Sequence, residues 1–305
     1  MMMRTYGLAL CLFLLFVDNA AADSAHQPRT SIVDAAPTEK CDEASSETTL
    51  LLQARLPEAS GDARERALRN LAQSQDTRVI AACIDLMRFT NAREEYVTIL
   101  QALRTLLGER MDELENPWET LTVWYGAHAE LQPPPGYAAW KGKLHAQRID
   151  PRFRQFLYDG PATAMCVEEV VWGGVTVDGI PALVNPRMCP ATEANNLSDH
   201  ELVFDVSING NHRAYPLRIF DWHEMANDVV GGRPVVLAYC TRCGSGVLYD
   251  ATAAGKTSVF GSSDFLFRSN TLMYDRATNT LWNQLTGEPM IGKLVGLNIV
   301  AYDST

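Results

Sequence analysis

The chain has 305 residues, enough for about two domains, and its 47% hydrophobic and 21% charged residues are ordinary for a globular protein. The formal net charge is −11 and no basic run is present, which argues against nucleic acid as a partner because an acidic surface repels phosphate backbones. After the N-terminal segment no stretch approaches membrane-spanning length, so no membrane span is expected in the mature chain.

Residues 1–22 have the pattern of a secretory signal peptide. Arg4 precedes the apolar core Tyr6–Val17, and Ala20–Ala22 supplies the small residues of a cleavage site. An uncleaved anchor is the alternative, but the apolar core is short for a membrane span. The pattern therefore predicts an exported protein, periplasmic or secreted, whose remaining cysteines meet an oxidising compartment.

Two regions follow the predicted signal peptide. Residues 23–47 are rich in Ala, Ser, Thr, Asp and Glu and are predicted to form a flexible tether. Helical periodicity follows over 48–115, with Asp62 and Asp76 as candidate N-caps, and this region resembles helical-hairpin repeats of the HEAT type. Cys83 lies in one of the apolar stripes, so it is expected in the core.

Residues 116–160 are predicted to be an irregular, aromatic connector, because Pro133–Gly136 interrupts any helix there. The histidines of this segment, His128 and His145, are expected to be solvated. From residue 161 to 305 the pattern changes to short strands separated by glycine turns. The predicted fold class is thus α+β, with N-terminal α-helical hairpin repeats followed by a β-rich mixed domain.

Two local signals organise the β-rich region. Asn209-Gly210 between apolar alternations predicts a tight hairpin. Asp221 with Glu224 three residues later forms a capping box, which predicts a short helix from Asp221 to the glycines at 231–232. The run RPVVLAYC, residues 233–240, is predicted to be a buried strand that returns antiparallel to this helix.

Three long blocks within Glu168–Gly296 resemble the bacterial family catalogued as domain of unknown function 3179. They contain, in order, DGIPALVNPRMCPATEA, DVSINGNHRAYPLRIFDWHEMANDVVGG and FGSSDFLFRSNTLMYDRATNTLWNQLTGEP. The resemblance implies a domain boundary and no particular activity. Members of that family usually continue into a Trp-containing C-terminal segment, so the resemblance also implies that the chain is a fragment or lacks a closing element.

The candidate functional site is the stretch YCTRCG, in which Cys240 and Cys243 are three positions apart and Gly244 follows. Two thiolates at this spacing on a tight turn can bind one metal ion, and the glycine permits backbone N–H groups to point at sulfur. The chain has no second cysteine pair at this spacing, so the pattern supplies half of a structural zinc site.

His223 is the predicted third ligand. A helix from Asp221 would rise about 14 Å and the returning strand would span about 20 Å, so the strand should end near the first helical turn. The helix dipole would favour thiolates at that position. Two sulfurs and an imidazole suit copper or zinc, with a slight preference for copper in an exported protein, and Met273 or a water is the candidate fourth ligand.

Two other functions fit the same cysteines, and whether the chain is an enzyme stays open. The pair can cycle between dithiol and disulfide in an oxidoreductase, although no helix follows it as in thioredoxin-like enzymes. It can also be an inert crosslink in a non-enzymatic binding module, whose partner would be a small molecule or a protein.

The remaining site predictions concern the surroundings of the cysteines. A metalloprotease H-E-x-x-H motif is excluded because Asn227 stands where the second histidine belongs. Cys166 and Cys189 are a separate candidate disulfide. The residues expected to line the mouth of the site are Arg242, Ser245, Asn270 and Asn283.

Overall fold

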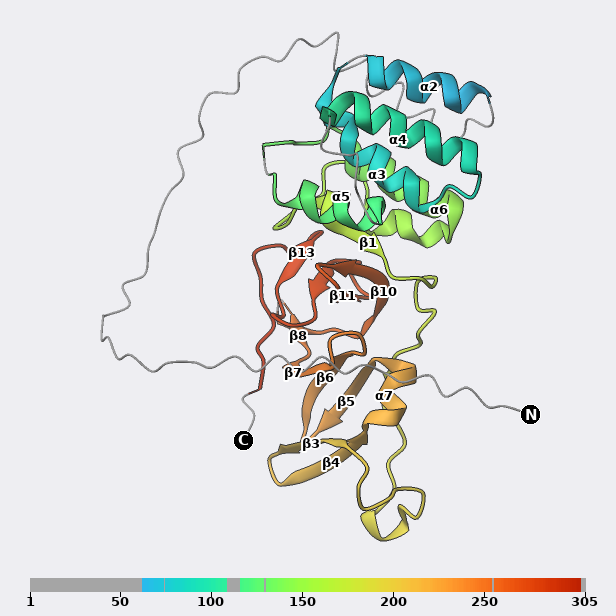
Figure 1. Ribbon diagram of the computed structural model, residues 1–305. Coiled ribbons are helices and arrows are strands. Elements are labelled where there is room, and N and C mark those ends of the chain that lie inside the picture. Colours follow the sequence, from blue (N-terminus) through green and yellow to red (C-terminus); the bar gives the residue numbers. More distant parts are fainter. Residues whose placement is uncertain (1–61, 74, 109–115, 129, 254, 303–305) are drawn as a thin grey trace, which may run out of the picture. The chain divides into compact units, whose positions relative to one another are not determined.

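The computed structural model describes residues 62–73, 75–108, 116–128, 130–253 and 255–302. The chain divides into two compact units, Met1–Lys40 and Cys41–Thr305, and all described residues lie in the second. That unit combines helices with a β-rich C-terminal region, which confirms the α+β class (Figure 1). The predicted signal peptide and tether lie outside the described residues.

The N-terminal part of this unit contains the helices α2 (Asp62–Gln73), α3 (Ile80–Arg88) and α4 (Arg93–Leu107). Asp76 is a cap as predicted: its carboxylate accepts a hydrogen bond from the backbone N–H of Arg78 at the short helix η1 (Thr77–Val79). Asp62 is the first residue of α2. Both α2 and α3 contact α4, and Cys83 is fully buried in their shared core, as expected. The HEAT-type repeat itself remains a prediction.

The predicted irregular connector contains two further helices, α5 (Pro117–Gly126) and α6 (Tyr137–Arg148). Pro117 occupies the first turn of α5, where a backbone N–H group would have no acceptor within the helix, so its absence costs no hydrogen bond. The proline run does interrupt the helices, and Gly136 caps α6 at a φ of +80°. Because α3 contacts both helices, aromatic side chains such as Tyr125 and Tyr137 are buried. Tertiary packing therefore turned a weakly periodic segment into two helices.

His145 is buried, contrary to the prediction of a solvated side chain. Its Nδ1 lies 2.8 Å from the carbonyl oxygen of Lys141. Burial lowers the pKa of His145 to about 3, so the ring is neutral at physiological pH. Its ring contacts three aromatic side chains, Phe89, Phe153 and Phe265.

A buried ion pair joins α3 to α6. Lys141 is fully buried, and its Nζ lies 3.0 Å from Oδ1 of Asp85 and 3.2 Å from the carbonyl oxygen of Glu168. The Tyr137 hydroxyl donates a hydrogen bond to the other Asp85 oxygen over 2.6 Å. The two charges neutralise one another and have further hydrogen bonds, which is the condition for burying Lys and Asp.

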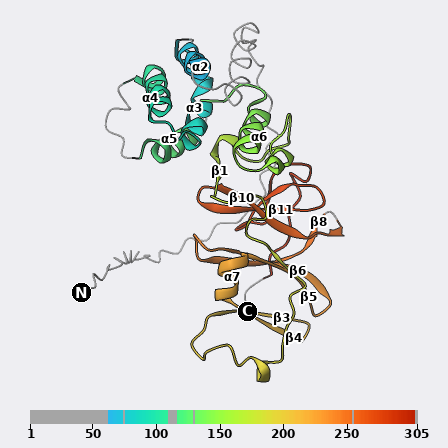
Figure 2. The same cartoon turned by 90° about the vertical axis from the view of Figure 1, so that its right-hand side faces the viewer.

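Two sheets form the β-rich part. The antiparallel sheet β1-β10-β11-β12-β13 consists of Val170–Trp172, Phe260–Phe267, Asn270–Asp275, Leu281–Asn283 and Pro289–Ile291. The sheet β2-β5-β6-β7 consists of Leu183–Val184, Met225–Val230, Arg233–Cys240 and Ser245–Asp250. β10 contacts β5 and β11 contacts β6, so the two sheets meet (Figures 1 and 2). This meeting brings the end of β6 close to the start of β11.

The predicted hairpin at Asn209-Gly210 is confirmed. Both turn residues have positive φ, 50° and 74°, as a primed turn requires. The flanking strands are β3 (Val203–Ile208) and β4 (Asn211–Pro216), and a shorter hairpin joins β8 (Thr252–Ala253) to β9 (Lys256–Thr257). Three single-turn helices complete the fold: η3 (Pro151–Gln155), η4 (Val167–Glu169) and η5 (Ala191–Glu193).

The prediction that a helix starts at Asp221 is wrong. The helix α7 spans Leu217–His223, and Glu224, at a φ of +53°, ends it before β5 begins. The glycines at 231–232 have φ values of +55° and +78° and form the β5–β6 hairpin turn instead of a helix cap. Pairing with β6 buries most of β5, and this non-local contact outweighs the local capping signal.

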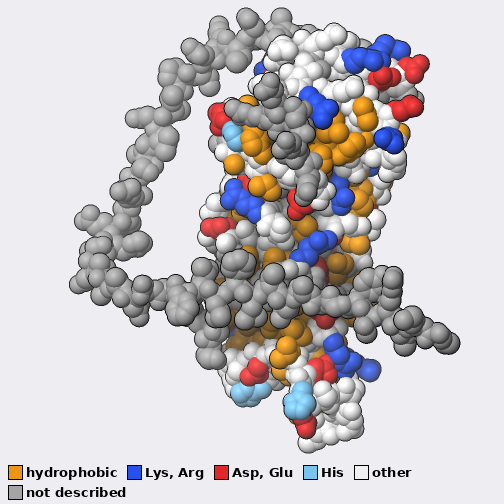
Figure 3. All heavy atoms as spheres, viewed as in Figure 1, with side chains coloured by type: hydrophobic (Ala, Val, Ile, Leu, Met, Phe, Trp, Pro, Cys, Tyr) orange, Lys and Arg blue, Asp and Glu red, His pale blue; other side chains and the backbone are white. Residues whose placement is uncertain are grey.

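None of the described helices is both long and apolar enough to cross a membrane. On the face drawn in Figure 3, Lys and Arg side chains lie among acidic and hydrophobic ones and do not gather into one basic patch.

Candidate functional site

Cys240 and Cys243 lie at the turn between β6 and β7. Cys240 is the last residue of β6 and is fully buried, whereas Cys243 is exposed. The backbone N–H of Cys243 donates to the carbonyl of Cys240, and Gly244 has a φ of +61°, which lets the chain return into β7. The two Sγ atoms lie 3.2 Å apart, beyond the roughly 2.05 Å of a disulfide, so both cysteines are free thiols.

Polar groups at the start of β11 surround the two sulfurs. The Cys243 thiol donates to the carbonyl oxygen of Ser269 over 3.4 Å, and Nδ2 of Asn270 donates to the Cys243 sulfur over 3.6 Å. Thr271 hydrogen-bonds to Cys240 through its side chain and its backbone. The exposed thiol therefore has both a donor and an acceptor beside it, and the buried sulfur has donors.

These contacts give the two thiols different acidities. Burial opposes ionisation of Cys240, but hydrogen bonds with Cys243 and Thr271 outweigh it and hold the pKa of Cys240 below its usual value. Burial and the adjacent Cys240 sulfur raise the pKa of Cys243, against a hydrogen bond from Asn270. Ionisation is therefore easier at the buried Cys240 sulfur than at the exposed Cys243 sulfur.

Gln284 holds Asn270 in place. Its Oε1 accepts a hydrogen bond from Asn270 Nδ2 over 2.9 Å, and its Nε2 donates to the carbonyl oxygens of Ala238, at 2.9 Å, and Ser245, at 3.3 Å. Both amide side chains are buried, so water does not compete for these bonds. Gln284 thus ties β12, β11 and the β6–β7 hairpin together around the sulfurs.

Two buried carboxyl groups adjoin the same turn. Oε1 of Glu224 accepts a hydrogen bond from the Thr241 hydroxyl over 2.9 Å, and Asp264 accepts one from the backbone N–H of Val175 over 2.6 Å. Burial raises the pKa of Glu224. Burial, reinforced by Glu224 and opposed by Arg242, raises the pKa of Asp264 to about 7. Asp264 can therefore take up or supply a proton near neutral pH, and its electrostatic interactions connect it to Glu224 and Arg242.

The predicted metal ligands do not form one group. His223 is the last residue of α7, at the negative end of the helix dipole, and its Nδ1 lies 2.8 Å from the Pro181 carbonyl oxygen. Met273 is fully buried in the hydrophobic core beside Trp282. In the described part of the chain, no three His, Cys, Asp or Glu side chains are placed to hold one metal ion. Binding of copper or zinc at Cys240 and Cys243 stays a prediction.

The residues expected at the mouth of the site have separate positions. Asn270 contacts Cys243, and the hydroxyl of Ser245 lies 3.5 Å from Oε1 of Gln284. Asn283 instead accepts a hydrogen bond from the backbone N–H of Leu285 within its own turn. Sequence reasoning missed four buried polar residues of the site: Glu224, Asp264, Thr271 and Gln284. For Asp264 in β10 and Thr271 in β11, a polar residue within an apolar strand was the available signal.

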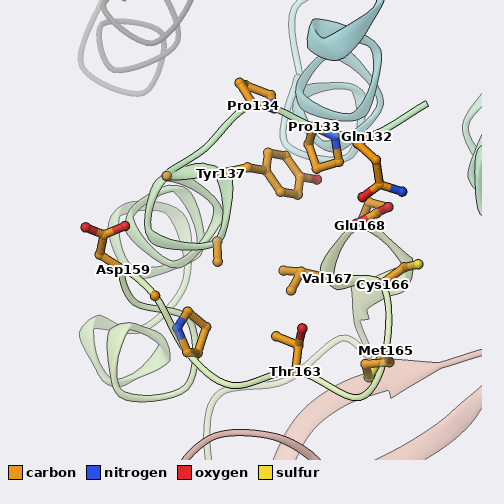
Figure 4. A pocket seen from close by; sticks show the side chains of 14 residues that line it. Gln132, Pro133, Pro134, Tyr137, Asp159, Thr163, Met165, Cys166, Val167 and Glu168 are labelled. Carbon is orange, nitrogen blue, oxygen red and sulfur yellow. The ribbon is translucent and has the colours of Figure 1, made fainter. Parts of the chain in front are cut away.

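The predicted disulfide between Cys166 and Cys189 is not formed, and both are free thiols. They lie on separate segments, with Cys166 directly before η4 and Cys189 in the loop between β2 and η5. Cys166 borders a cavity of about 280 Å³, but its sulfur points away from the hollow (Figure 4). Burial and the charge of Glu168 raise the pKa of Cys166, which makes this thiol a poor nucleophile.

The fold and the site define an α+β domain whose two sheets meet around a two-cysteine hairpin turn. The family described as "Protein of unknown function (DUF3179)" matches residues 177–304, which include both thiols, Asn270 and Gln284. This match supports the resemblance predicted from the sequence for that part of the chain. No curated protein and no solved structure matches the chain.

Proposed function

We propose that this protein carries out thiol–disulfide redox chemistry at Cys240 and Cys243. The supporting observation is the 3.2 Å contact between two free sulfurs, of which one is buried with a lowered pKa and the other is exposed. The sulfurs need to approach by only about 1.2 Å to reach disulfide bonding distance. The exposed sulfur can meet a substrate, and the buried one lies where it can complete the exchange.

The co-reactant is a molecule that carries a disulfide. Cys243 passes its proton to the Cys240 thiolate, and the resulting Cys243 thiolate attacks one substrate sulfur and releases the other as a thiolate. Cys240 then loses its proton and attacks the Cys243 sulfur of the mixed disulfide, which releases the second substrate thiolate. The thiolate and thiol of the protein are oxidised by two electrons to a disulfide, and one substrate disulfide is reduced to two thiolates. The single proton of the cysteine pair passes to one released thiolate, and the other takes its proton from solvent.

The test is a redox titration of the purified protein against reduced and oxidised glutathione, read by alkylation and peptide mass spectrometry. One reversible two-electron transition is expected on the peptide that contains Cys240 and Cys243, while the buried Cys83 stays unmodified. A pair that stays reduced at every glutathione ratio contradicts the proposal. A pair that stays oxidised in excess reductant indicates an inert crosslink instead.

A soft metal ion is the second candidate, favoured by the geometry of the turn. Gly244 has the left-handed conformation of a cysteine knuckle, and the Asn270 amide donates to the Cys243 sulfur as outer groups do around metal-bound thiolates. Thiolates select copper(I) and zinc. Metal analysis of the purified protein tests this reading, and less than about a tenth of an equivalent of either metal excludes it.

We also infer that the protein is exported, on the signal-peptide pattern of residues 1–22. An oxidising compartment would supply the disulfides that the proposed reaction needs. The contacts of α2 and α3 with α4 support, for this region, an arrangement of HEAT-type hairpins. Fractionation of cells that express the full chain tests export: a shortened protein in the exported fraction is expected, and a full-length cytoplasmic protein contradicts it.

A further inference from the structure

A cavity of about 600 Å³ lies directly beside the exposed thiol. Its wall includes Arg242, which stands between the two cysteines in the chain, and Ser269, whose carbonyl accepts the hydrogen bond from Cys243. Most of the remaining wall comes from α3, α5, η4, β1 and the end of β10. This volume falls within the range of about 300–1,000 Å³ that is typical of small-molecule sites.

Three arginines from separate elements converge on this cavity: Arg88, Arg242 and Arg268. Arg268 is neutralised, because it forms two hydrogen bonds with the carboxylate of Glu169 at 2.7 and 3.1 Å. No carboxylate of the described residues lies within ion-pair distance of Arg88 or Arg242. Arg242 does interact electrostatically with Glu224 and Asp264, and Glu119 lines the wall together with Glu169. The arginines of the wall still outnumber its carboxylates by three to two in a chain of net charge −11, which favours an anion in the cavity.

The wall also offers flat apolar surface. The indoles of Trp118 and Trp172 line the cavity, and the Arg88 guanidinium lies over both rings, at 5.0 and 5.6 Å from their centres. The attraction between cation and ring holds the guanidinium beside the indoles, while its N–H groups remain available to an acceptor. Val171 and Leu266 add aliphatic surface to the same wall.

We propose that this cavity binds a small organic anion with a flat apolar body. The body packs against the two indoles and the aliphatic side chains, and the anionic group accepts hydrogen bonds from Arg88 and Arg242. One N–H group of Arg242 donates a hydrogen bond to the carbonyl oxygen of Gly173 over 2.9 Å. A guanidinium has five N–H groups, so others remain for the ligand. The proposal does not depend on the chemistry of the cysteines, although the ligand would lie next to Cys243.

Calorimetric titration with 2-naphthoate tests the proposal, with 2-naphthylmethylammonium as a cation of the same shape and quenching of tryptophan fluorescence as a second readout. One equivalent of the anion is expected to bind, about tenfold more tightly than the cation. Arg88→Gln and Arg242→Gln should each weaken the anion about tenfold, since each removes one charge-assisted contact. Both arginines are exposed, so both variants should keep the fold, which circular dichroism checks.

Two controls separate this proposal from others. Lys256→Gln removes an exposed positive charge at β9, away from the cavity wall, and should bind the anion like the wild type. The double variant Cys240→Ser, Cys243→Ser should also bind it, so a failed redox titration would leave this result intact. Equal binding of anion and cation, absence of binding, or wild-type affinity in both arginine variants would overturn the proposal.

Discussion

The Lys141→Met substitution should destabilise the protein by about 3–5 kcal/mol, because it leaves Asp85 buried without its cation. The Nζ–Oδ1 distance is 3.0 Å, at which the attraction between unit charges is about 5.5 kcal/mol for an effective dielectric constant of about 20. Desolvation of both charges offsets part of that attraction in the wild type. Methionine keeps the apolar stem of the lysine, so the substitution creates little cavity.

The assay is urea denaturation followed by circular dichroism, with thermal melting as a second readout. A loss of about 3 kcal/mol corresponds to a fall of roughly 6–12 °C in Tm for a domain of this size. The matched control combines Lys141→Met with Asp85→Asn. The asparagine still accepts the Tyr137 hydroxyl but carries no charge, so much of the lost stability should return.

The pH dependence of Lys141→Met checks the cause. Burial raises the pKa of Asp85, and the substitution removes the opposing charge of Lys141, so the folded variant favours the neutral carboxyl. A raised folded pKa means that the penalty is absent below the ordinary aspartate pKa and grows as the pH rises above it. A variant within about 1 kcal/mol of the wild type at pH 7 would refute the reasoning, because Asp85 would then not need its cation.

Three further predictions follow from single residues. Lowering the pH from about 6.5 towards 3 should destabilise the protein by up to about 1.4 kcal/mol per pH unit, because burial lowers the pKa of His145 in the folded state to about 3. In urea titrations at several pH values, His145→Gln should reduce this dependence of the unfolding free energy on pH. An unchanged dependence would contradict the prediction. Gly231→Ala should lower the free energy of unfolding more than Gly232→Ala. Both glycines have positive φ, but only a Cβ at Gly231 would meet a backbone carbonyl. Equal losses of unfolding free energy in the two variants would contradict this prediction. Cys240→Ser should speed alkylation of Cys243 at pH 7, because the Cys240 sulfur raises the pKa of Cys243. Mass spectrometry of the alkylated peptide measures the rate, and a slower rate than in the wild type would contradict the prediction.

The parts of the fold that depend on local chemistry were predictable from the sequence. The turn at Asn209-Gly210 needs two residues that tolerate positive φ, and those residues are visible in the sequence. The segment after Asp221 was not predictable in the same way. Its capping box favours a helix, but β5 exists because it pairs with β6 along its whole length, and no local pattern records that pairing.

The candidate site was also predictable only in the part that depends on local sequence. The spacing of Cys240 and Cys243 on a turn was enough to predict that their sulfurs meet. The groups that set their acidity come from β11 and β12, and these reach the sulfurs only because the two sheets meet. The position of His223 was calculated from a helix that begins at Asp221, whereas His223 is the last residue of α7 and β5 follows it.

The hairpin gives this thiol pair a property that a pair at the start of a helix would lack. A helix dipole acts on the cysteine at the helix terminus, which is reachable by substrate. Here the hydrogen bonds with Thr271 and Cys243 act on the buried Cys240, so the sulfur that ionises more easily is the shielded one. In the proposed reaction a proton must therefore move between the sulfurs before Cys243 can attack a substrate. Arg242 lowers the pKa of Cys243 and also lines the neighbouring cavity, so an anion bound there would weaken that effect and make Cys243 less reactive.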